Sequence, residues 1–159
     1  MADPLEVRIR RARVSDLPSI LQLFSEDALH FVSQEKTAEL PEVDEAYVRA
    51  LELIQATPDN NVYVAEADGR VAGTFQLTFI QQLSHCGARV AQVENVFVLA
   101  EQRSRGIGSA MLRFAIEEAA QHHCIRIQLT TNVRRERAHA FYQRLGFEPT
   151  HHGMKRYLR

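Results

Sequence analysis

The segment from residue 93 to residue 108 constrains the fold more than any other part of the sequence. An apolar strand pattern gives way to a short loop, and a helical pattern begins at once. The first amides of a helix have no partners inside it and lie at the positive end of its dipole. Gly106 and Gly108 let an anion approach this backbone without meeting a Cβ atom, and Arg103 and Arg105 add positive charge. The segment therefore predicts a site for an anion such as a pyrophosphate.

Two well-known phosphate-binding loops do not fit this segment. A P-loop needs a glycine followed by lysine and then by serine or threonine, and no glycine in the chain precedes a lysine. A dinucleotide fingerprint needs a small third residue where the chain has Met111. It also needs an acid about 20 residues farther on, where the chain has Arg126. The anion site is therefore of another kind.

The rest of the sequence predicts a mixture of strands and helices within one domain, residues 1–159. No internal repeat, low-complexity tract or flexible linker divides the chain. Strands are expected at 7–14, 61–67, 71–80, 90–99 and, as a buried strand, 125–131, with extended chain over 147–158. Helices are expected from Ser15 as the N-cap, from Pro41, over 106–122 and over 135–145. Elements mixed in this way predict an α/β (α+β) domain around one mostly antiparallel sheet.

Three sequence patterns, taken together, resemble one family. The first is Arg103-x-x-Gly106-x-Gly108 directly after the apolar strand. The second is Leu129-Thr130-Thr131-Asn132 followed by Ala138-x-x-Phe141-Tyr142-x-x-Leu145-Gly146-Phe147. The third is Ile9-Arg10-Arg11-Ala12-x-x-x-Asp16-Leu17-Pro18. They resemble the acyl-CoA loop, the closing motif and the first strand and helix of the GNAT superfamily of N-acetyltransferases. The resemblance runs from about residue 7 to residue 158 and is weakest at 26–60 and 81–89, where the family builds its acceptor sites.

The resemblance implies a GNAT fold, with a twisted and splayed central sheet of about six or seven strands flanked by about four helices. It implies acetyl-CoA as the co-substrate. The loop amides would hold the CoA pyrophosphate, and the end of the preceding strand would run beside the pantetheine arm. The residues implied in binding are Phe97, Val98, Leu99, Arg103, Ser104, Arg105, Gly106, Ile107, Gly108, Ser109, Asn132 and Arg135.

Glu94 is the candidate general base for attack of an amine on the acetyl thioester. A primary amine with a pKa near ~10 is protonated at neutral pH, and a nearby carboxylate can take that proton directly or through water. Strand alternation predicts one face with Gln92, Glu94, Val96 and Val98 and another with Val93, Asn95 and Phe97. Glu94 is either this base or an acid held by a structural hydrogen bond or an arginine. Asn95 is a competitor on the opposite face.

Tyr142 matches the residue that the family uses to protonate the departing thiolate. A tyrosine with a pKa near ~10 can give a proton to a thiolate of similar pKa. Tyr142 also shares a helical face with Ala138 and Leu145, so the alternative is a packing role. Asn132 either hydrogen-bonds near the CoA arm or closes an ordinary turn. Arg135 either touches the 3′-phosphate of CoA or only starts a helix.

The net charge of −1 hides two opposed regions. Residues 26–52 hold 8 acids against 2 bases, whereas residues 101–159 hold 11 bases against 5 acids. The basic region coincides with the proposed polyphosphate site. The acidic one lies where the family's first helices border the acceptor, which favours a cationic amine. The alternative is that both regions are solvated helix faces.

Several other functions and locations are disfavoured by the sequence. The His122-His123-Cys124 and His151-His152 clusters lack metal-ligand spacing, so no metal is expected. The chain has no basic surplus for nucleic acid and no apolar run of the ~20 residues that a membrane helix needs. Two cysteines and a start without signal-peptide character predict a cytoplasmic protein. Relatives that dimerise through C-terminal strands make a homodimer possible.

The sequence leaves more than one function open. The first is an acetyl-CoA-dependent N-acetyltransferase acting on a small-molecule amine by direct attack in a ternary complex. Alternatives are a catalytically silent acyl-CoA sensor, a protein N-acetyltransferase, and an RNA- or protein-associated module using the arginine-rich region. Small amines, polyamines, aminoglycoside-like drugs and aminoalkyl phosphonates all stay open as acceptors.

Overall fold

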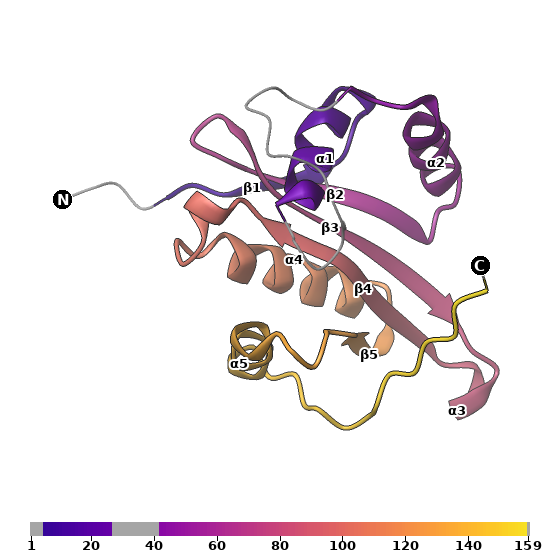
Figure 1. The fold of residues 1–159 in the computed structure, drawn as a ribbon. Helices are drawn as coiled ribbons and strands as arrows, with labels where there is room; N and C mark the ends of the chain where they lie inside the picture. The colour runs from indigo at the N-terminus through magenta and orange to yellow at the C-terminus, as the bar shows by residue number, and fades with distance from the viewer. Residues whose placement is uncertain (1–4, 27–41, 159) are drawn as a thin grey trace.

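Five strands form one open sheet in the order β1-β2-β3-β4-β5 in the computed structural model, which describes residues 5–26 and 42–158 (Figure 1). The strands are β1 (Arg8–Arg11), β2 (Asn60–Ala67), β3 (Arg70–Gln81), β4 (Arg89–Val98) and β5 (Cys124–Leu129). Neighbouring strands are antiparallel except β4 and β5, which are parallel. The prediction of a mostly antiparallel sheet in an α/β domain is confirmed.

Helices lie on both faces of this sheet (Figure 1). One face carries α1 (Leu17–Ser25) and α2 (Glu45–Gln55), and the other carries α4 (Ile107–Gln121) and α5 (Glu136–Arg144). A short helical turn, α3 (Ser84–Gly87), joins β3 to β4. The helix expected from Pro41 begins later, at Glu45, because the Asp44 carboxylate accepts a hydrogen bond from the Ala46 amide at 2.7 Å. Pro41 itself lies outside the described residues.

The larger core lies between the sheet and α4. Phe75 and Leu77 of β3 are fully buried there against Met111 of α4. The Phe114 ring meets the rings of Tyr63 and Phe75 edge-on, with centroids 5.1 and 6.3 Å away. Burying one such side chain contributes roughly 1.5–3 kcal/mol. A second, smaller core under α1 and α2 contains Ala12, Leu17, Ile20, Leu51 and Val64.

The first helix is fixed to the sheet by a partly buried network of ion pairs. Arg10 of β1 donates to the Asp16 carboxylate at 2.7 and 2.9 Å and to Glu66 of β2 at 2.7 Å. Asp16 also accepts from the Arg13 amide at 2.7 Å, which shapes a 3-10 turn before α1. Burial raises the pKa of Asp16, but these hydrogen bonds outweigh it and lower the pKa below its ordinary value. The expected N-cap at Ser15 is therefore wrong, since Asp16 organises this helix start instead.

The C-terminal part of the chain differs from expectation. Residues 147–158 form no strand, and residues 148–158 are exposed. In the described part of the chain, nothing pairs with the outer edge of β5. The side chain of Ile125, which was expected to be buried, is 56% exposed. The described sheet therefore has five strands instead of the six or seven expected. Among these residues, no helix combines the length and the apolar character needed to cross a membrane.

Candidate active site

The sheet opens between β4 and β5. These two parallel strands are paired from Arg89 and Cys124 as far as Val93 and Leu129. Beyond this point β4 continues to Val98 while β5 ends. A slot therefore begins beside Glu94, where the backbone of β4 has lost its neighbour on that side.

A bulge in β4 changes which side chains face which way. Gln76 of β3 pairs with Glu94, but Thr74 pairs with Phe97, so Asn95 and Val96 together oppose one residue. Asn95 has a φ of 53°, the left-handed conformation that asparagine tolerates better than most residues.

The bulge corrects the expected alternation along this strand. Thr74 and Gln76 share a face of β3, so their partners Phe97 and Glu94 share a face of β4. Val98 pairs with Gly73 and therefore lies on the opposite face, toward α4. The prediction that grouped Val98 with Glu94 and separated Phe97 from it is wrong, because the extra residue reverses the alternation.

Glu94 lies on the face away from α4 and is exposed. Within the described residues, its carboxylate makes no hydrogen bond or ion pair. The neighbouring Asn95 donates to the Gln76 side-chain oxygen at 3.5 Å. Because Glu94 is exposed, the burial cost that led us to expect a partner does not arise, and its carboxylate is accessible beside the slot.

The loop after β4 forms an anion cradle, defined here as residues 104–109. Ser104 and Gly106 both have positive φ values, 64° and 89°, and α4 starts directly after Gly106 without a side-chain cap. The first helical hydrogen bond runs from the Ala110 amide to the Gly106 carbonyl at 3.0 Å. Within the described structure, the amides of 104–109 make no hydrogen bond. Successive unpaired amides at a helix start are a strong anion site.

The arginines of this loop are engaged by the protein itself. Arg103 donates from Nε to the Val98 carbonyl at 3.1 Å. Arg105 pairs with Asp68 of the β2–β3 turn at 2.8 Å and also contacts Gln102. The expected positive charge is present at the cradle, but its two arginines hold the loop in shape while the backbone amides stay available.

Two other elements contact the loop between β4 and α4, residues 99–106, and sequence reasoning missed both. At the start of β3, Arg70 pairs with Glu101 at 2.7 Å, beside the contact that Asp68 of the β2–β3 turn makes with Arg105. At the end of α1, the Glu26 carboxylate accepts from the Ala100 amide at 2.8 Å. These partners are more than 30 residues away in sequence, and no local pattern marks them.

Helix α5 packs on the start of α4 and positions Tyr142. A Cβ atom at Gly108 would lie 3.2 Å from the Phe141 ring, so this glycine makes room for α5. Tyr142 is half-buried between Phe141 and Phe147, at centroid distances of 5.2 and 5.9 Å. Burial raises the pKa of Tyr142, although the charge of Arg135 acts in the opposite direction. The phenol is therefore held in its protonated form.

Asn132 and Arg135 lie between β5 and α5. The Asn132 side-chain oxygen accepts from the Arg134 amide at 2.9 Å, closing a turn, and its carbonyl accepts from the Arg135 amide at 2.9 Å. Arg135 is the residue before α5 and acts electrostatically on Tyr142. The turn role foreseen for Asn132 thus occurs, and its amide nitrogen has no partner among the described residues.

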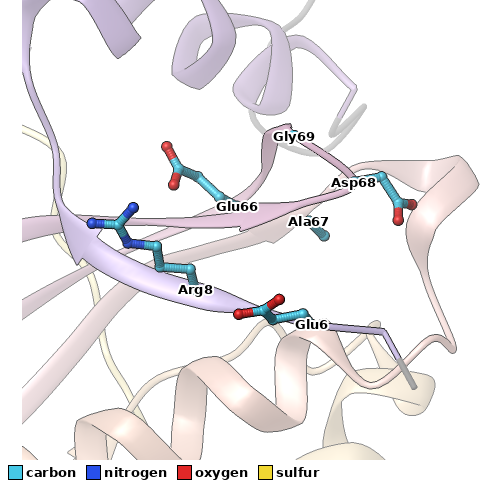
Figure 2. Close-up of a pocket in the computed structure, with 6 residues that line it drawn as sticks. All are labelled: Glu6, Arg8, Glu66, Ala67, Asp68 and Gly69. Carbon is cyan, nitrogen blue, oxygen red and sulfur yellow. The ribbon is translucent and has the colours of Figure 1, made fainter. Parts of the chain in front are cut away.

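A shallow hollow of about 370 Å³ lies next to the cradle, on the other side of the β2–β3 turn (Figure 2). It is lined by Glu6, Arg8, Glu66, Ala67, Asp68 and Gly69. The hollow shares Asp68 with the cradle contacts, but its lining contains none of the expected catalytic residues. In the part of the chain that the structure describes, no group of histidine, cysteine and acidic side chains is arranged to hold a metal ion.

Comparison with protein families matches residues 18–147 to the acetyltransferase (GNAT) family. The chain belongs to the GNAT family. The co-substrate of this family is acetyl-CoA. The splayed sheet, the bulged strand and the cradle described above are the parts of this chain that carry the GNAT fold.

Three known proteins show how far the similarity extends. The aminoalkylphosphonate N-acetyltransferase of Salmonella typhimurium is 35% identical over 95 residues, which are 58% of this chain and 61% of that protein. The glucosamine 6-phosphate N-acetyltransferase of Trypanosoma brucei brucei is 24% identical over 92% of each chain. A crystal structure described as a transcriptional regulator from Bacillus halodurans C-125 is 34% identical, with a TM-score of 0.87 over 96% of this chain and 100% of that one.

Proposed function

We propose that this protein transfers the acetyl group of acetyl-CoA to a primary amine of a small molecule, by direct attack in a ternary complex. The observation that carries the proposal is the exposed Glu94 carboxylate, which lies where the sheet opens, on the same strand that leads into the anion cradle. An anion-binding loop alone would account for binding of the co-substrate. An accessible acid beside the slot adds a base that can take a proton from the acceptor amine.

The residues of the cradle fit the CoA end of acetyl-CoA. The unpaired amides of 104–109 suit a pyrophosphate, and Gly106 faces open space, since a Cβ atom added there would have no atom within 4 Å. The end of β4 at Phe97 and Val98, with Leu99 directly after it, would run beside the pantetheine arm. When bound, acetyl-CoA supplies the acetyl thioester on which the amine acts. Asn132 and Arg135 would lie near the other end of the slot.

Glu94 would take the proton that keeps the amine from reacting. The acceptor arrives as an ammonium ion, which a carboxylate attracts, and loss of one proton to Glu94 frees the nitrogen lone pair. The nitrogen then bonds to the acetyl carbon, the carbon–sulfur bond breaks, and the nitrogen loses its second proton to solvent to give the neutral amide. The proton on Glu94 leaves to solvent after the transfer.

Tyr142 would donate a proton to the departing sulfur. Burial raises the pKa of Tyr142, so its phenol carries a proton over the whole neutral range. The thiolate receives this proton, and the phenol regains one from solvent. The packing of Tyr142 between Phe141 and Phe147 supports this role by fixing the ring direction.

A small molecule is favoured over a peptide as the acceptor. Two relatives are named for acetylation of small amines, an aminoalkylphosphonate and glucosamine 6-phosphate. The acidic region also supports an acceptor that arrives as an ammonium ion. Its described part includes Glu42, Asp44, Glu45 and Glu52 around α2, and residues 27–41 lie outside the described residues.

Release of free CoA thiol in the presence of an amine panel tests this function. We expect thiol release that depends on both acetyl-CoA and an amine. The proposed mechanism is overturned if Glu94→Gln and Tyr142→Phe both keep the maximal rate within about twofold.

A second candidate is a regulatory function that relies on acetyl-CoA binding. The observation favouring it is the similarity to a structure described as a transcriptional regulator. A regulator would bind acetyl-CoA but release no thiol with any amine. The same assay, combined with calorimetric titration of acetyl-CoA, therefore separates the two functions.

A homodimer belongs to the same proposal. The outer edge of β5 is unpaired among the described residues, and the exposed C-terminal segment nearby carries Met154, Tyr157 and Leu158. An open strand edge next to apolar side chains favours pairing with a second copy. Sedimentation of the full chain is expected to give a dimer mass, and a monomer at high concentration would contradict this part.

The two free cysteines are compatible with a reducing cytoplasm.

A further inference from the structure

A straight row of polar side chains crosses the sheet on the face of Glu94. The strand pairing places Asn60 of β2 opposite Thr78 of β3, Thr78 opposite Gln92 of β4, and Gln92 opposite Gln128 of β5. All four residues are half-buried. This polar row lies two residues from Glu94 along β4, so the row and the proposed base share one surface.

Hydrogen bonds along the polar row fix its amides. Thr78 and Gln76 both donate to the Asn60 side-chain oxygen, at 3.0 and 2.9 Å. Gln128 donates to the Gln92 side-chain oxygen at 2.9 Å. These contacts leave the amide nitrogens of Asn60 and Gln92 without a partner among the described residues. A row of fixed amides with unused donors is able to bind oxygen atoms of a ligand.

Arg126 ends this surface with a positive charge. Its guanidinium donates to the side-chain oxygens of Gln128 at 3.2 Å and Gln82 at 3.5 Å. Both partners are neutral, and no carboxylate of the described residues pairs with Arg126. Three other arginines of the sheet do pair with acids, namely Arg10, Arg70 and Arg89. Arg126 is therefore oriented by the amides while its charge stays uncompensated.

The positive and negative ends of this surface are well separated. Arg126 pairs with Val90, and Glu94 lies four residues farther along β4. Four residues of strand span about 13 Å, and the neighbouring strand adds about 4.8 Å sideways. Gln92 of β4 lies between Arg126 and Glu94 on this surface. A molecule placed along β4 would therefore meet a carboxylate at one end, amides in the middle and a guanidinium at the other end.

We infer that the acceptor is a zwitterion whose amine lies at Glu94 and whose phosphonate or phosphate group binds Arg126, with Gln92 and Gln128 between them. The inference rests on the proposed acetyl transfer at Glu94 and adds a binding site at the other end of the acceptor. A guanidinium is suited to phosphate and phosphonate oxygens, and hydrogen bonds to charged groups are stronger than those between neutral ones. The amine is the group that would be acetylated, and the anionic group would determine which amine-bearing molecules bind.

Two acceptors that differ only in the anionic group test the inference. Ethanolamine and 2-aminoethylphosphonate have the same amine and a chain of the same length, so their ratio of kcat/KM measures the contribution of the phosphonate. We expect the native protein to prefer 2-aminoethylphosphonate by about tenfold or more. Arg126→Gln should abolish this preference while leaving both the ethanolamine rate and the KM for acetyl-CoA unchanged.

Matched variants separate a charge effect from a general loss. Arg126→Lys keeps the charge without the planar fork and should retain part of the preference. Arg113→Gln removes an exposed arginine from α4, on the other face of the sheet, and should leave kcat/KM for both acceptors unchanged. Because Arg126 is an exposed edge-strand residue, its substitution should leave the fold intact. Equal rates for the two acceptors, or an equal loss for both in Arg126→Gln, would overturn the inference.

Direct binding keeps this test independent of the proposed function. If neither amine is acetylated, the proposed acetyl transfer fails, and titration calorimetry with the same two compounds still examines the Arg126 site. Tighter binding of 2-aminoethylphosphonate than of ethanolamine, lost in Arg126→Gln, supports the site. Binding that does not distinguish the two compounds contradicts it.

Discussion

The two halves of the candidate active site are built in different ways. The anion cradle is a continuous stretch of backbone, and six neighbouring amides at a helix start make it. The acceptor surface is a set of side chains from four strands, Asn60, Thr78, Gln92 and Gln128, with Arg126 and Glu94 at its ends. One half depends on local conformation and the other on the register of the whole sheet.

This difference separates what the two halves can specify. Backbone amides recognise a phosphate group whatever side chains surround them, so a cradle of this kind is suited to a co-substrate that many relatives share. A surface of side chains changes with each substitution and can distinguish one acceptor from another. Variants on the two halves should therefore affect different kinetic constants.

The largest expected effect is at Glu94, where the acceptor surface meets the slot. We expect Glu94→Gln to lower kcat by about 100-fold, because the amide cannot take the ammonium proton. The KM for acetyl-CoA should stay within about twofold, since Glu94 is not part of the cradle. Steady-state kinetics with both substrates varied measures the two constants. Glu117→Gln, an exposed acid on α4, is the matched control and should behave as the native protein.

Tyr142→Phe should lower kcat by a smaller factor, about 10-fold or somewhat more. The effect is smaller because a thiolate with a pKa near ~8.5–10 already leaves readily at neutral pH. Burial raises the pKa of Tyr142, so the protonated and active form persists below that raised pKa. The native rate should therefore hold up to about pH 10 and fall only above it. A pH profile of kcat measures this limb, and its persistence in Tyr142→Phe would show that another group donates the proton.

Gly106→Ala tests the cradle half. Gly106 has a φ of 89°, where a side chain costs roughly 1–2 kcal/mol. We expect the KM for acetyl-CoA to rise by about tenfold if the loop relaxes away from this conformation, while the KM for the amine stays constant. Gly87→Ala carries similar strain, at a φ of 75°, in the exposed α3 turn. This control should lose stability to a similar extent without changing either KM, and a rise in both would argue for a general effect of strain.

Much of the cradle was predictable from sequence because its parts are local. The strand, the loop and the helix lie within residues 93–108, and Gly106 takes the positive φ that a loop of this kind needs. The contacts that hold the loop were not predictable. Asp68 and Glu26 reach Arg105 and the Ala100 amide from distant parts of the chain, and only the folded sheet brings them there.

The acceptor surface was less predictable because one residue changes its alternation. A regular strand would separate Phe97 from Glu94, but the bulge at Asn95 brings both to one face. The polar residues of the row are visible in the sequence, yet their alignment depends on the pairing register of four strands. The sequence likewise predicted a buried strand at 125–131. In the structure β5 is an edge strand, and among the described residues it is paired with β4 alone.

The smallest expected effect tests the bulge that joins the two halves. Asn95 has a φ of 53°, which glycine adopts freely and a β-branched residue adopts only with strain. Asn95→Gly should keep both stability and kcat/KM close to native values. Asn95→Val should lower the free energy of unfolding by about 1–2 kcal/mol and kcat/KM by a few fold, because relief of the strain would restore regular alternation and turn Phe97 away from Glu94.

His123→Val provides the matched control for this bulge. His123 has a similar φ of 55° in the connection between α4 and β5, away from the slot. It should lose a comparable amount of stability in urea unfolding with no change in kcat/KM. If Asn95→Val and His123→Val lose stability equally and both keep full activity, the bulge shapes the strand but does not align Glu94 with the slot. A loss of activity confined to Asn95→Val would instead tie the acceptor surface to the cradle through this single residue of β4.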